Sequence, residues 1–547
     1  MIESIELNCG RTIGSEHLTL GEHSGVTIFV GPNNSGKSVL LNSLFGALTR
    51  SGSARPSALK SVRPAAFVDT MLIGRKEFEG KAPDDLVDVN GHKLTKTNWI
   101  NLLTQDASWQ SDFGQIFRFA ECIWMNGTTR LAMLPNETNA SLTNPNSALA
   151  RLLSDDDRRK EFQETVFYGV SHYPFVDHVS LIGTLKLAFS TKFPEVSTER
   201  GMEKEMVAFA QQSVPRDSVS DGFNAYVGMM GTVFASDYKC IFIDEPEAFL
   251  HPALARTLGK QLAQKTQGKQ IFVATHSADF VMGAIESGTP VRIVRLQFQN
   301  SAPTACLLDQ DELAQFMNDP LLRSANVLSG LFAGSVVVGE SDTDRAFYQE
   351  INTRLLTAKD PRGIENAVFL NAQNKQTVPK IVKLLRKMGV PTVGMVDLDV
   401  LAEGGRNWVH QMTGSGVPDL MRDPLATSRQ SVFASLQAAS TDPDRKDYKT
   451  RGGINLLDRD KKEAAESVLS KLLEYGLLVV ARGEVEAWLS ELDIGRSKHT
   501  WLREIFERLG NNPADASYVR PVAGDVWDFV GTANQWLKDP IRKGMNI

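Results

Sequence analysis

The sequence contains a complete phosphate-binding loop motif near its N-terminus. The run Gly31-Pro32-Asn33-Asn34-Ser35-Gly36-Lys37-Ser38 matches the pattern GxxxxGK[ST]. In such a loop the backbone N–H groups surround phosphate oxygens, the lysine reaches the β- and γ-phosphates, and the serine hydroxyl is a Mg²⁺ ligand. A compact apolar run, 26–30, precedes the loop, and a helical pattern, 39–48, follows it. The sequence therefore predicts an ATP site that uses Mg²⁺.

Two adjacent carboxylates follow the apolar run 240–243. We expect Asp244 to hold Mg²⁺ through water and Glu245 to polarise the attacking water as a general base. Another strand pattern, 270–274, leads to His276, which is placed to sense a γ-phosphate and resembles the switch histidine of ABC-type ATPases. Solvated acids and a structural histidine are the alternatives, but the complete loop upstream favours catalysis.

The segment around Ser220 and Gly222 resembles a degenerate ABC signature sequence. The serine and glycine of that signature cap the γ-phosphate of ATP bound by a partner subunit. The resemblance therefore implies a homodimer or higher homo-oligomer formed through the ATPase domains, although Ser-Asp-Gly is also common turn chemistry. No glutamine between residues 50 and 200 can be assigned to the Q-loop of the ABC pattern.

A second set of acids follows three strand patterns in the C-terminal half. Because they are hard oxygen ligands without an intervening Cys or His, they fit Mg²⁺ or Mn²⁺, and two such ions could support cleavage of a phosphodiester. In an extended segment residues i and i+2 share a face, which would bring Asp397 and Asp399 together, and likewise Glu484 and Glu486. At the start of a helix residues i and i+4 share a face, which would bring Glu340 and Asp344 together. Solvated acids at strand ends are the alternative at each position. The acids are Glu340, Asp344, Asp397, Asp399, Glu484 and Glu486.

The order of Glu340 and Asp397-Leu398-Asp399 resembles the Toprim domain, and an ABC-type ATPase followed by Toprim resembles the OLD (overcoming lysogenization defect) family of ATP-dependent nucleases. The resemblance implies that all the C-terminal acids are metal ligands, with the choice between Glu484 and Glu486 open. It also implies a lysine that stabilises the charged transition state, for which Lys498 is the candidate and a surface lysine the alternative.

The same resemblance favours an ATP-regulated, metal-dependent DNA endonuclease in anti-phage defence, with ATP and Mg²⁺ or Mn²⁺ as cofactors. It also implies a possible operon-encoded partner, such as a reverse transcriptase or a helicase. An ATPase sensor or scaffold with an inactive Toprim domain, controlling a separate effector, is the alternative. A third candidate is a repair ATPase of the RecF type. The Toprim acids count against it, because such a protein has no need for them.

These motifs require an α/β chain with an ABC-type P-loop ATPase domain that carries a helical insertion, followed by a Toprim α/β domain. We expect the ATPase domain over 1–325, with an insertion at about 50–200, and the Toprim domain over 330–500, with an insertion at about 401–465. A helical extension over 501–547 completes the prediction. The lysines and arginine of 380–387 would lie on a helix surface that could hold nucleic acid.

Composition sets the remaining expectations. The 547 residues are 42% hydrophobic and carry a net charge of −6, so a nucleic-acid surface must be a local patch. Four scattered cysteines fit a reducing cytosol and argue against a structural zinc site. No secretion signal and no membrane-spanning run is apparent, and we expect a cytoplasmic protein.

Overall fold

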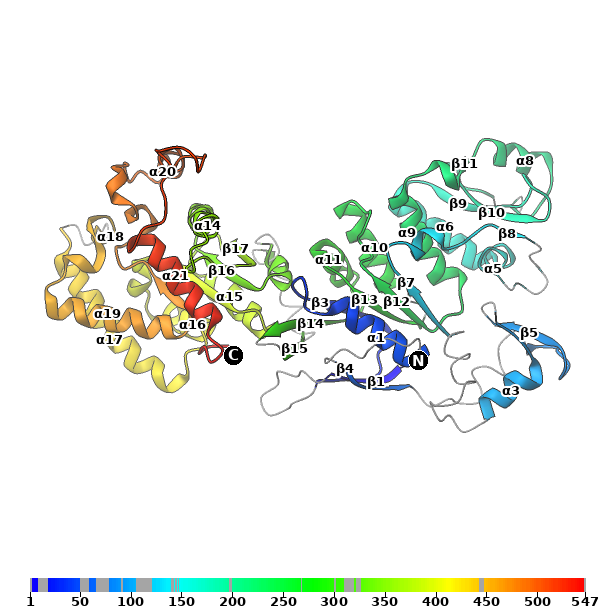
Figure 1. Cartoon of the computed structure of the whole chain (residues 1–547), viewed down its shortest axis with the longest axis horizontal. Helices are drawn as coiled ribbons and strands as arrows, with labels where there is room; N and C mark the ends of the chain where they lie inside the picture. Colours follow the sequence, from blue (N-terminus) through cyan, green and yellow to red (C-terminus); the bar gives the residue numbers. More distant parts are fainter. Residues whose placement is uncertain are drawn as a thin grey trace. The chain divides into compact units, whose positions relative to one another are not determined.

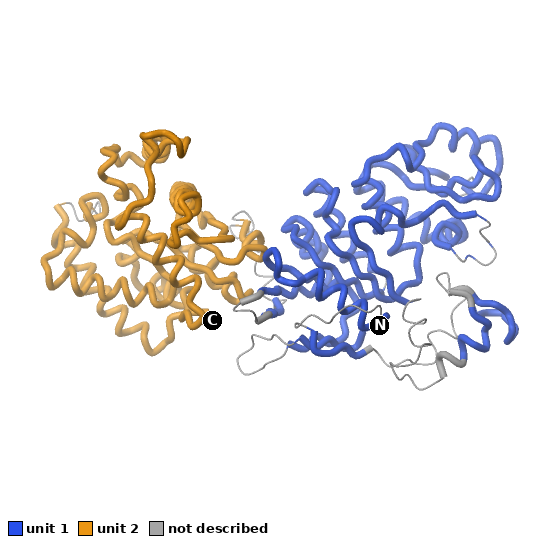
Figure 2. Tube along the Cα trace, viewed as in Figure 1, with its two compact units in different colours: residues 1–310 blue, residues 311–547 orange. Residues whose placement is uncertain are grey.

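The computed structural model describes residues 2–7, 18–49, 59–64, 78–89, 92–104, 121–138, 142, 145, 147–195, 199–266, 268–299, 302–308, 319–320, 326–441 and 447–545. The chain divides into two compact units, Met1–Gln310 and Asp311–Ile547, which Figure 2 shows in different colours. Each unit is built around a sheet of its own that is mainly or wholly parallel.

A six-stranded sheet with the order β15-β14-β3-β13-β12-β7 forms the centre of the first unit (Figure 1). The β14–β15 pair is antiparallel, and the other pairs are parallel. Residues of β3 are buried along the whole strand, which is typical of a sheet covered on both faces. The strands are β3 (Gly25–Val30), β7 (Cys122–Met125), β12 (Cys240–Asp244), β13 (Gln270–Ala274), β14 (Val291–Gln299) and β15 (Ala302–Leu307).

Helix α1 and a small antiparallel sheet, β2-β1-β4, cover one face of this central sheet. Leu40 and Leu44 of α1 lie in one buried cluster with Phe29, Phe242 and Ile5. Helices α10 and α11 pack on each other and lie on the side of the sheet away from α1 (Figure 1). The elements are β1 (Ile2–Leu7), β2 (Leu18–Leu20), α1 (Lys37–Thr49), β4 (Leu59–Pro64), α10 (Pro252–Gln264) and α11 (Ala278–Glu286).

The predicted insertion, residues 50–200, contains strands as well as helices where the structure describes it. Helix α6 packs on α9, the helix that begins just after Ser220, and a four-stranded sheet lies beside these helices. The elements are β5 (Leu86–Val89), β6 (His92–Thr95), α3 (Lys96–Thr104), η2 (Thr129–Ala132), β8 (Glu137–Thr138), α5 (Ala148–Ser154), α6 (Asp156–Val170), β9 (Tyr173–Asp177), β10 (Thr184–Ser190), α8 (Lys204–Gln211), β11 (Val214–Pro215), η3 (Arg216–Ser218) and α9 (Asp221–Ala235).

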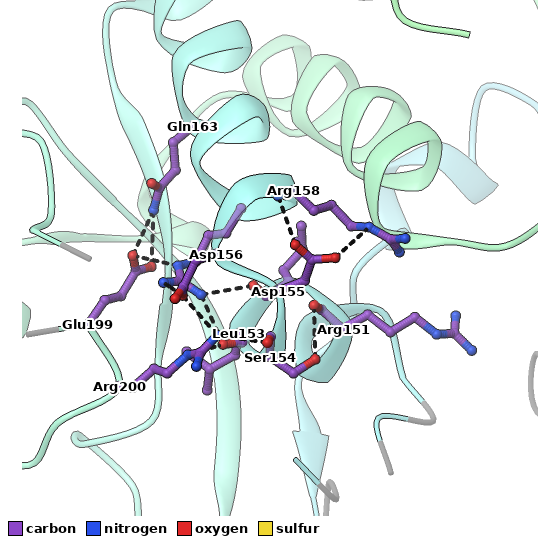
Figure 3. Close-up of polar contacts among 11 residues, drawn as sticks. Arg151, Leu153, Ser154, Asp155, Asp156, Arg158, Gln163, Glu199 and Arg200 are labelled. Atoms are coloured by element: carbon purple, nitrogen blue, oxygen red, sulfur yellow. Dashed lines mark hydrogen bonds and ion pairs between the residues drawn. The ribbon is translucent and has the colours of Figure 1, made fainter. Parts of the chain in front are cut away.

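A buried polar cluster joins α6 to the chain around residue 199 (Figure 3). The Glu199 side chain has no exposed surface and accepts a hydrogen bond from Arg159 Nε at 2.8 Å. Gln163 Nε2 donates to both Glu199 carboxylate oxygens at 3.0 Å, and Arg159 also donates to two backbone carbonyls. Because a buried charge is costly without partners, this network fixes the segment that precedes α8 onto α6.

The second unit is built on a four-stranded parallel sheet with the order β17-β16-β18-β19. Parallel strands put their carboxyl ends at one edge of the sheet, so the acids that follow β16, β18 and β19 come to the same edge. The strands are β16 (Ser335–Gly339), β17 (Ala367–Asn371), β18 (Thr392–Val396) and β19 (Leu477–Val479).

Helices surround this sheet, and the predicted C-terminal extension belongs to the same core. Trp501 of α20 and Trp527 of α21 are fully buried in a cluster with Phe347 and Val337. The elements are η4 (Val327–Phe332), α14 (Asp342–Thr357), α15 (Val378–Lys387), η5 (Leu398–Ala402), α16 (Gly405–Gly414), α17 (Asp419–Ala439), α18 (Tyr448–Arg451), η7 (Gly453–Leu456), α19 (Arg459–Glu474), η8 (Val485–Ala487), η9 (Ser490–Leu492), α20 (Trp501–Leu509) and α21 (Asp525–Lys538).

Candidate functional site

The phosphate-binding loop runs from the end of β3 to the first turn of α1 and folds around its lysine. Lys37 Nζ donates to Gly31 O at 2.9 Å, to Pro32 O at 3.0 Å and to Ser35 Oγ at 3.3 Å. Burial lowers the pKa of Lys37 to about 8, despite the nearby carboxylates that raise it. The ammonium is therefore held by weak, neutral acceptors that a phosphate oxygen can replace.

Gly31 is required by the close approach of this loop to β14. Its φ of 144° lies where side chains are rarely found, and a Cβ atom there would lie 2.1 Å from Leu296 O. Asn34 also has a positive φ, 62°, which an asparagine tolerates. Asn33, Asn34 and Gly36 complete the backbone curve that would surround the phosphates.

The end of β12 brings the first acid to the loop. Ser38 Oγ donates to Asp244 Oδ1 at 2.8 Å. The two predicted Mg²⁺ ligands therefore lie next to each other. Burial raises the pKa of Asp244, because desolvation disfavours the charged carboxylate. The hydroxyl and carboxylate oxygens are the hard donors that Mg²⁺ prefers.

Glu245 and His276 lie beside each other at the ends of adjacent strands. Their side chains approach to 3.9 Å between Glu245 Oε1 and His276 Nε2, and Glu245 has a positive φ of 52°. Burial, and then the charge of Lys37, lowers the pKa of His276, which favours the neutral ring. A half-exposed carboxylate and a neutral imidazole can both reach a nucleotide phosphate or its attacking water.

Two further residues hold this edge of the sheet together, and the sequence analysis did not assign them. Glu247 is partly buried, and it accepts from His276 N at 2.7 Å and from Thr275 Oγ1 at 2.8 Å. Burial raises the pKa of Glu247. The Arg130 guanidinium, which has no exposed surface, donates to Glu245 O. In the sequence, the only signal for Glu247 is its short distance from Asp244. The residues around Arg130 contain no signal for its role.

Ser220 and Gly222 lie at the start of α9. Ser220 Oγ accepts from Phe223 N at 3.3 Å and so caps the helix, and a Cβ atom on Gly222 would lie 2.4 Å from Phe249 O. No hydrogen bond or ion pair between described residues joins either of them to the phosphate-binding loop. The role of Ser220 and Gly222 across a dimer stays a prediction.

Strand β7 pairs with β12 at one edge of the central sheet and ends just before a turn. The residue there is Asn126, whose Oδ1 accepts from the backbone N atoms of Thr128 and Thr129 at 3.1 and 3.0 Å. This asparagine turn leads into the short helix η2, which carries Arg130.

Three of the predicted metal ligands meet in the second unit. Glu340, Asp397 and Asp399 each offer a carboxylate oxygen, and these oxygens lie within 4.8 Å of one another. Asp397 N donates to Glu340 Oε1 at 2.8 Å. Burial, and then the charge of Asp397, raises the pKa of Glu340 to about 8; burial also raises that of Asp397. Closely spaced, desolvated carboxylates fit a hard divalent cation such as Mg²⁺ or Mn²⁺.

The predicted geometry of the two aspartates was wrong, although they do lie together. Asp397 precedes η5, and Asp399 lies inside this 3₁₀ helix, so the segment does not continue as an extended strand. The first residue of this helix also contacts the segment after β19, since Leu398 N donates to Gly483 O at 2.8 Å. The carboxylates thus converge through a turn rather than through strand alternation.

Asp344, Glu484 and Glu486 lie outside the group of three oxygens. Ser341 N and Ser341 Oγ donate to Asp344 Oδ2 at 2.8 and 2.6 Å, which forms a capping box at the start of α14. Burial, and then Asp397, raises the pKa of Asp344 to about 6. Both glutamates are buried, and burial, with a further contribution from Glu484, raises the pKa of Glu486 to about 7. The choice between the two glutamates stays open.

Three lysines face these acids, and only one of them was predicted. Lys498, the predicted one, is 65% exposed and lies 3.7 Å from Glu484 Oε2. Lys449 Nζ lies 2.8 Å from Asp397 Oδ2, 3.6 Å from Asp399 Oδ1 and 3.9 Å from Glu484 Oε2. Lys375 lies at 2.9 Å from Asp399 Oδ2. Lys449 comes from the polar insertion and Lys375 from the loop after β17, where no motif marks them.

The predicted basic helix surface is partly wrong. Arg386 of α15 is buried, donates to the carbonyl oxygens of Thr392, Ser415 and Tyr475, and stacks over Trp536 at 4.6 Å. Its guanidinium joins separate segments of the second unit and cannot contact a nucleic acid. The lysines of α15 remain as the basic side chains of that surface.

Two family models match the chain. Residues 26–283 match the model described as "AAA domain, putative AbiEii toxin, Type IV TA system". Residues 331–399 match the model described as "Overcoming lysogenization defect protein-like, TOPRIM domain". The first match includes the nucleotide loop with Asp244 and His276, and the second runs from before Glu340 to Asp399.

The chain is also similar to two curated proteins. It is 20% identical over 376 residues to the Old nuclease of Escherichia phage P2, a match that covers 65% of this chain and 60% of that protein. It is 22% identical over 278 residues to the endonuclease GajA of Bacillus cereus (strain VD045), covering 51% of this chain and 44% of that one. Each match thus spans less than two thirds of the relative. The solved SMC head domain from Thermotoga maritima is 13% identical, with a TM-score of 0.30, and the match covers 56% of this chain and 99% of that chain.

Among the described helices, none is both long and apolar enough to cross a membrane.

Proposed function

Because the chain belongs to the OLD family of proteins with an ATPase domain followed by a Toprim domain, we propose that it is an ATP-regulated, divalent-metal-dependent DNA endonuclease in anti-phage defence. The observation that carries this proposal is the convergence of Glu340, Asp397 and Asp399, whose oxygens lie within 4.8 Å of one another. The names of the two relatives, a nuclease and an endonuclease, support nucleic acid as the substrate.

The Toprim acids would hold the metal, with Glu340, Asp397 and Asp399 as its nearest donors. A divalent cation bound there supplies an activated water and stabilises negative charge on the phosphodiester. The backbone N–H of Asp397 positions the Glu340 carboxylate, and the Ser341 cap positions Asp344. Lysines around the acids offset their charge and would attract a phosphate backbone.

In the first unit, Lys37 would bind the β- and γ-phosphates, while Ser38 and Asp244 would hold Mg²⁺. Glu245 would accept a proton from the attacking water, and His276 would contact the γ-phosphate. Glu247 fixes the backbone of His276, so it acts as a positioning residue. Ser220 and Gly222 would reach ATP bound by a second copy, which makes dimerisation depend on ATP.

The test is cleavage of a plasmid with Mg²⁺ or Mn²⁺, with and without ATP, measured beside ATP hydrolysis. Asp397→Ala should lower cleavage by more than about 100-fold, because losing a ligand costs more than losing a residue that supports one. ATP hydrolysis by Asp397→Ala should stay near the wild-type rate. Lys37→Ala should lose ATP binding, as measured with a fluorescent ATP analogue.

Asp423→Ala is the matched control, since this exposed aspartate of α17 lies on the same unit with no role in the site. It should cleave and hydrolyse ATP like the wild type. If the wild-type protein hydrolyses ATP but never cuts DNA with either metal, the endonuclease proposal is refuted and the chain acts as an ATPase that controls a separate effector. Equal loss of both activities in Asp397→Ala would contradict two separate sites.

A further inference from the structure

The Toprim acids have an ammonium group of the chain itself among them. Lys449 Nζ donates to Asp397 Oδ2 at 2.8 Å and lies 3.6 Å from Asp399 Oδ1 and 3.9 Å from Glu484 Oε2. The side chain is 12% exposed, in contrast to the 65% of Lys498. Lys449 is thus the lysine most enclosed by the carboxylates that would bind a metal.

The backbone that carries Lys449 is fixed by two glycines. A Cβ atom on Gly483, which has a φ of 118°, would lie 2.0 Å from Lys449 O, so α18 can touch the end of β19 only because this residue is glycine. A Cβ atom on Gly453 would lie 2.1 Å from Ala481 O, and Ile454 N donates to the same oxygen at 3.0 Å. The Cα of Lys449 is therefore fixed, and only its side chain can change position.

A second lysine, Lys375, lies near the other carboxylate oxygen of Asp399. Lys375 Nζ lies 2.9 Å from both Asp399 Oδ2 and Glu403 Oε1. Lys375 therefore has a carboxylate partner, Glu403, outside the predicted ligand set. All three carboxylates near Lys449 belong to that set. A cation that enters the site consequently competes with Lys449 more than with Lys375.

Resting on the endonuclease function proposed above, we infer that Lys449 is a resident cation of the Toprim site that a divalent metal must displace from Asp397. Two positive groups cannot share one carboxylate oxygen without strong repulsion. After displacement the ammonium can move only as far as its side chain reaches, because its backbone is fixed beside the acids. It is then the nearest free donor for the non-bridging oxygens of the phosphodiester, and charge-assisted bonds to phosphate are strong. Lys449 would thus be a catalytic residue supplied by the insertion.

The experiment measures Mn²⁺ binding to the full chain without nucleotide, from the paramagnetic resonance signal of free Mn²⁺, and cleavage at saturating Mn²⁺. Lys449→Met should bind Mn²⁺ at least about tenfold more tightly, because the competing charge is gone. The same variant should cut DNA at least about tenfold more slowly at saturation. Lys449→Arg keeps the charge and should bind Mn²⁺ within about threefold of the wild type.

Lys471→Met is the matched control, since Lys471 pairs with Glu474 at 2.8 Å far along α19 and touches none of the Toprim acids. It should match the wild type in both measurements. A purely structural role of Lys449 would weaken metal binding and cleavage together, and unchanged Mn²⁺ affinity or an unchanged saturated rate in Lys449→Met would overturn the inference. Failure of the proposed function looks different, because Mn²⁺ binding would then not depend on Asp397.

Discussion

The buried cluster around Glu199 allows a prediction with a magnitude set by the structure. Glu199 and Arg159 are 0% and 1% exposed, and their side chains meet at 2.8 Å. Glu199→Ala would leave the buried Arg159 guanidinium with Asp156, which is 45% exposed, as its carboxylate partner. Removing one member of a buried pair costs about 3–5 kcal/mol, because the desolvated charge that remains loses its buried partner; the half-exposed Asp156 and two carbonyl oxygens place this case near the lower end of that range.

The same helix offers a matched comparison. Glu161 of α6 pairs with Lys265 at 2.6 Å, but the two side chains are 41% and 35% exposed. An exposed pair contributes about 0–1 kcal/mol, since water competes for both charges. Glu161→Ala should therefore change stability little, although its ion pair is the shorter of the two.

Differential scanning calorimetry of the metal-free chain would test this difference. At about 2–4 °C per kcal/mol, Glu199→Ala should lower the midpoint of the first unit by on the order of 10 °C. Glu161→Ala should lower it by no more than about 3 °C. Equal shifts in the two variants would refute the argument that burial, rather than distance, sets the energy of these pairs.

Three further predictions concern the two sites. Glu245→Gln should retain ATP and enrich an ATP-dependent dimer in light scattering, and an unchanged oligomer distribution would count against ATP shared between two chains. Gly31→Ala should abolish nucleotide binding in a fluorescent titration, because the added Cβ meets Leu296 O at 2.1 Å; wild-type binding would exclude that clash. The folded-state pKa values of Glu340 and Glu486, about 8 and 7, exceed the usual 4.5, so stability of the metal-free second unit should be lost progressively between pH 4.5 and about 8. Added Mg²⁺ should restore its melting temperature at pH 8, and a flat pH profile would contradict the buried acid cluster.

The nucleotide site was largely predictable from sequence because its parts are local. Lys37 bonds to carbonyl oxygens five and six residues before it, so an eight-residue motif contains most of the geometry. The acids after β12, β16 and β18 were also predictable, because parallel strands deliver their carboxyl ends to one edge. The sequence did not reveal that Asp399 lies in a 3₁₀ helix, whose first residue contacts Gly483, 85 residues further along the chain.

Long-range packing decided the rest. Lys449 reaches Asp397 across 52 residues of sequence, and Arg130 reaches Glu245 across 115. No local pattern encodes such pairs, because they depend on where an insertion or a neighbouring strand end settles. Arg386 shows the same limit: helical periodicity placed it on a surface, whereas the carbonyl oxygens around it hold it inside the core.

The sequence by itself thus determined which residue types form the two sites and in which order the sites follow along the chain. It could do so because a loop motif, or an acid at a strand end, is recognised from neighbouring residues. Only the tertiary structure decided which acids converge and which cations oppose them. The physical reason is that charges far apart along the chain interact strongly only when folding brings them together and removes them from water.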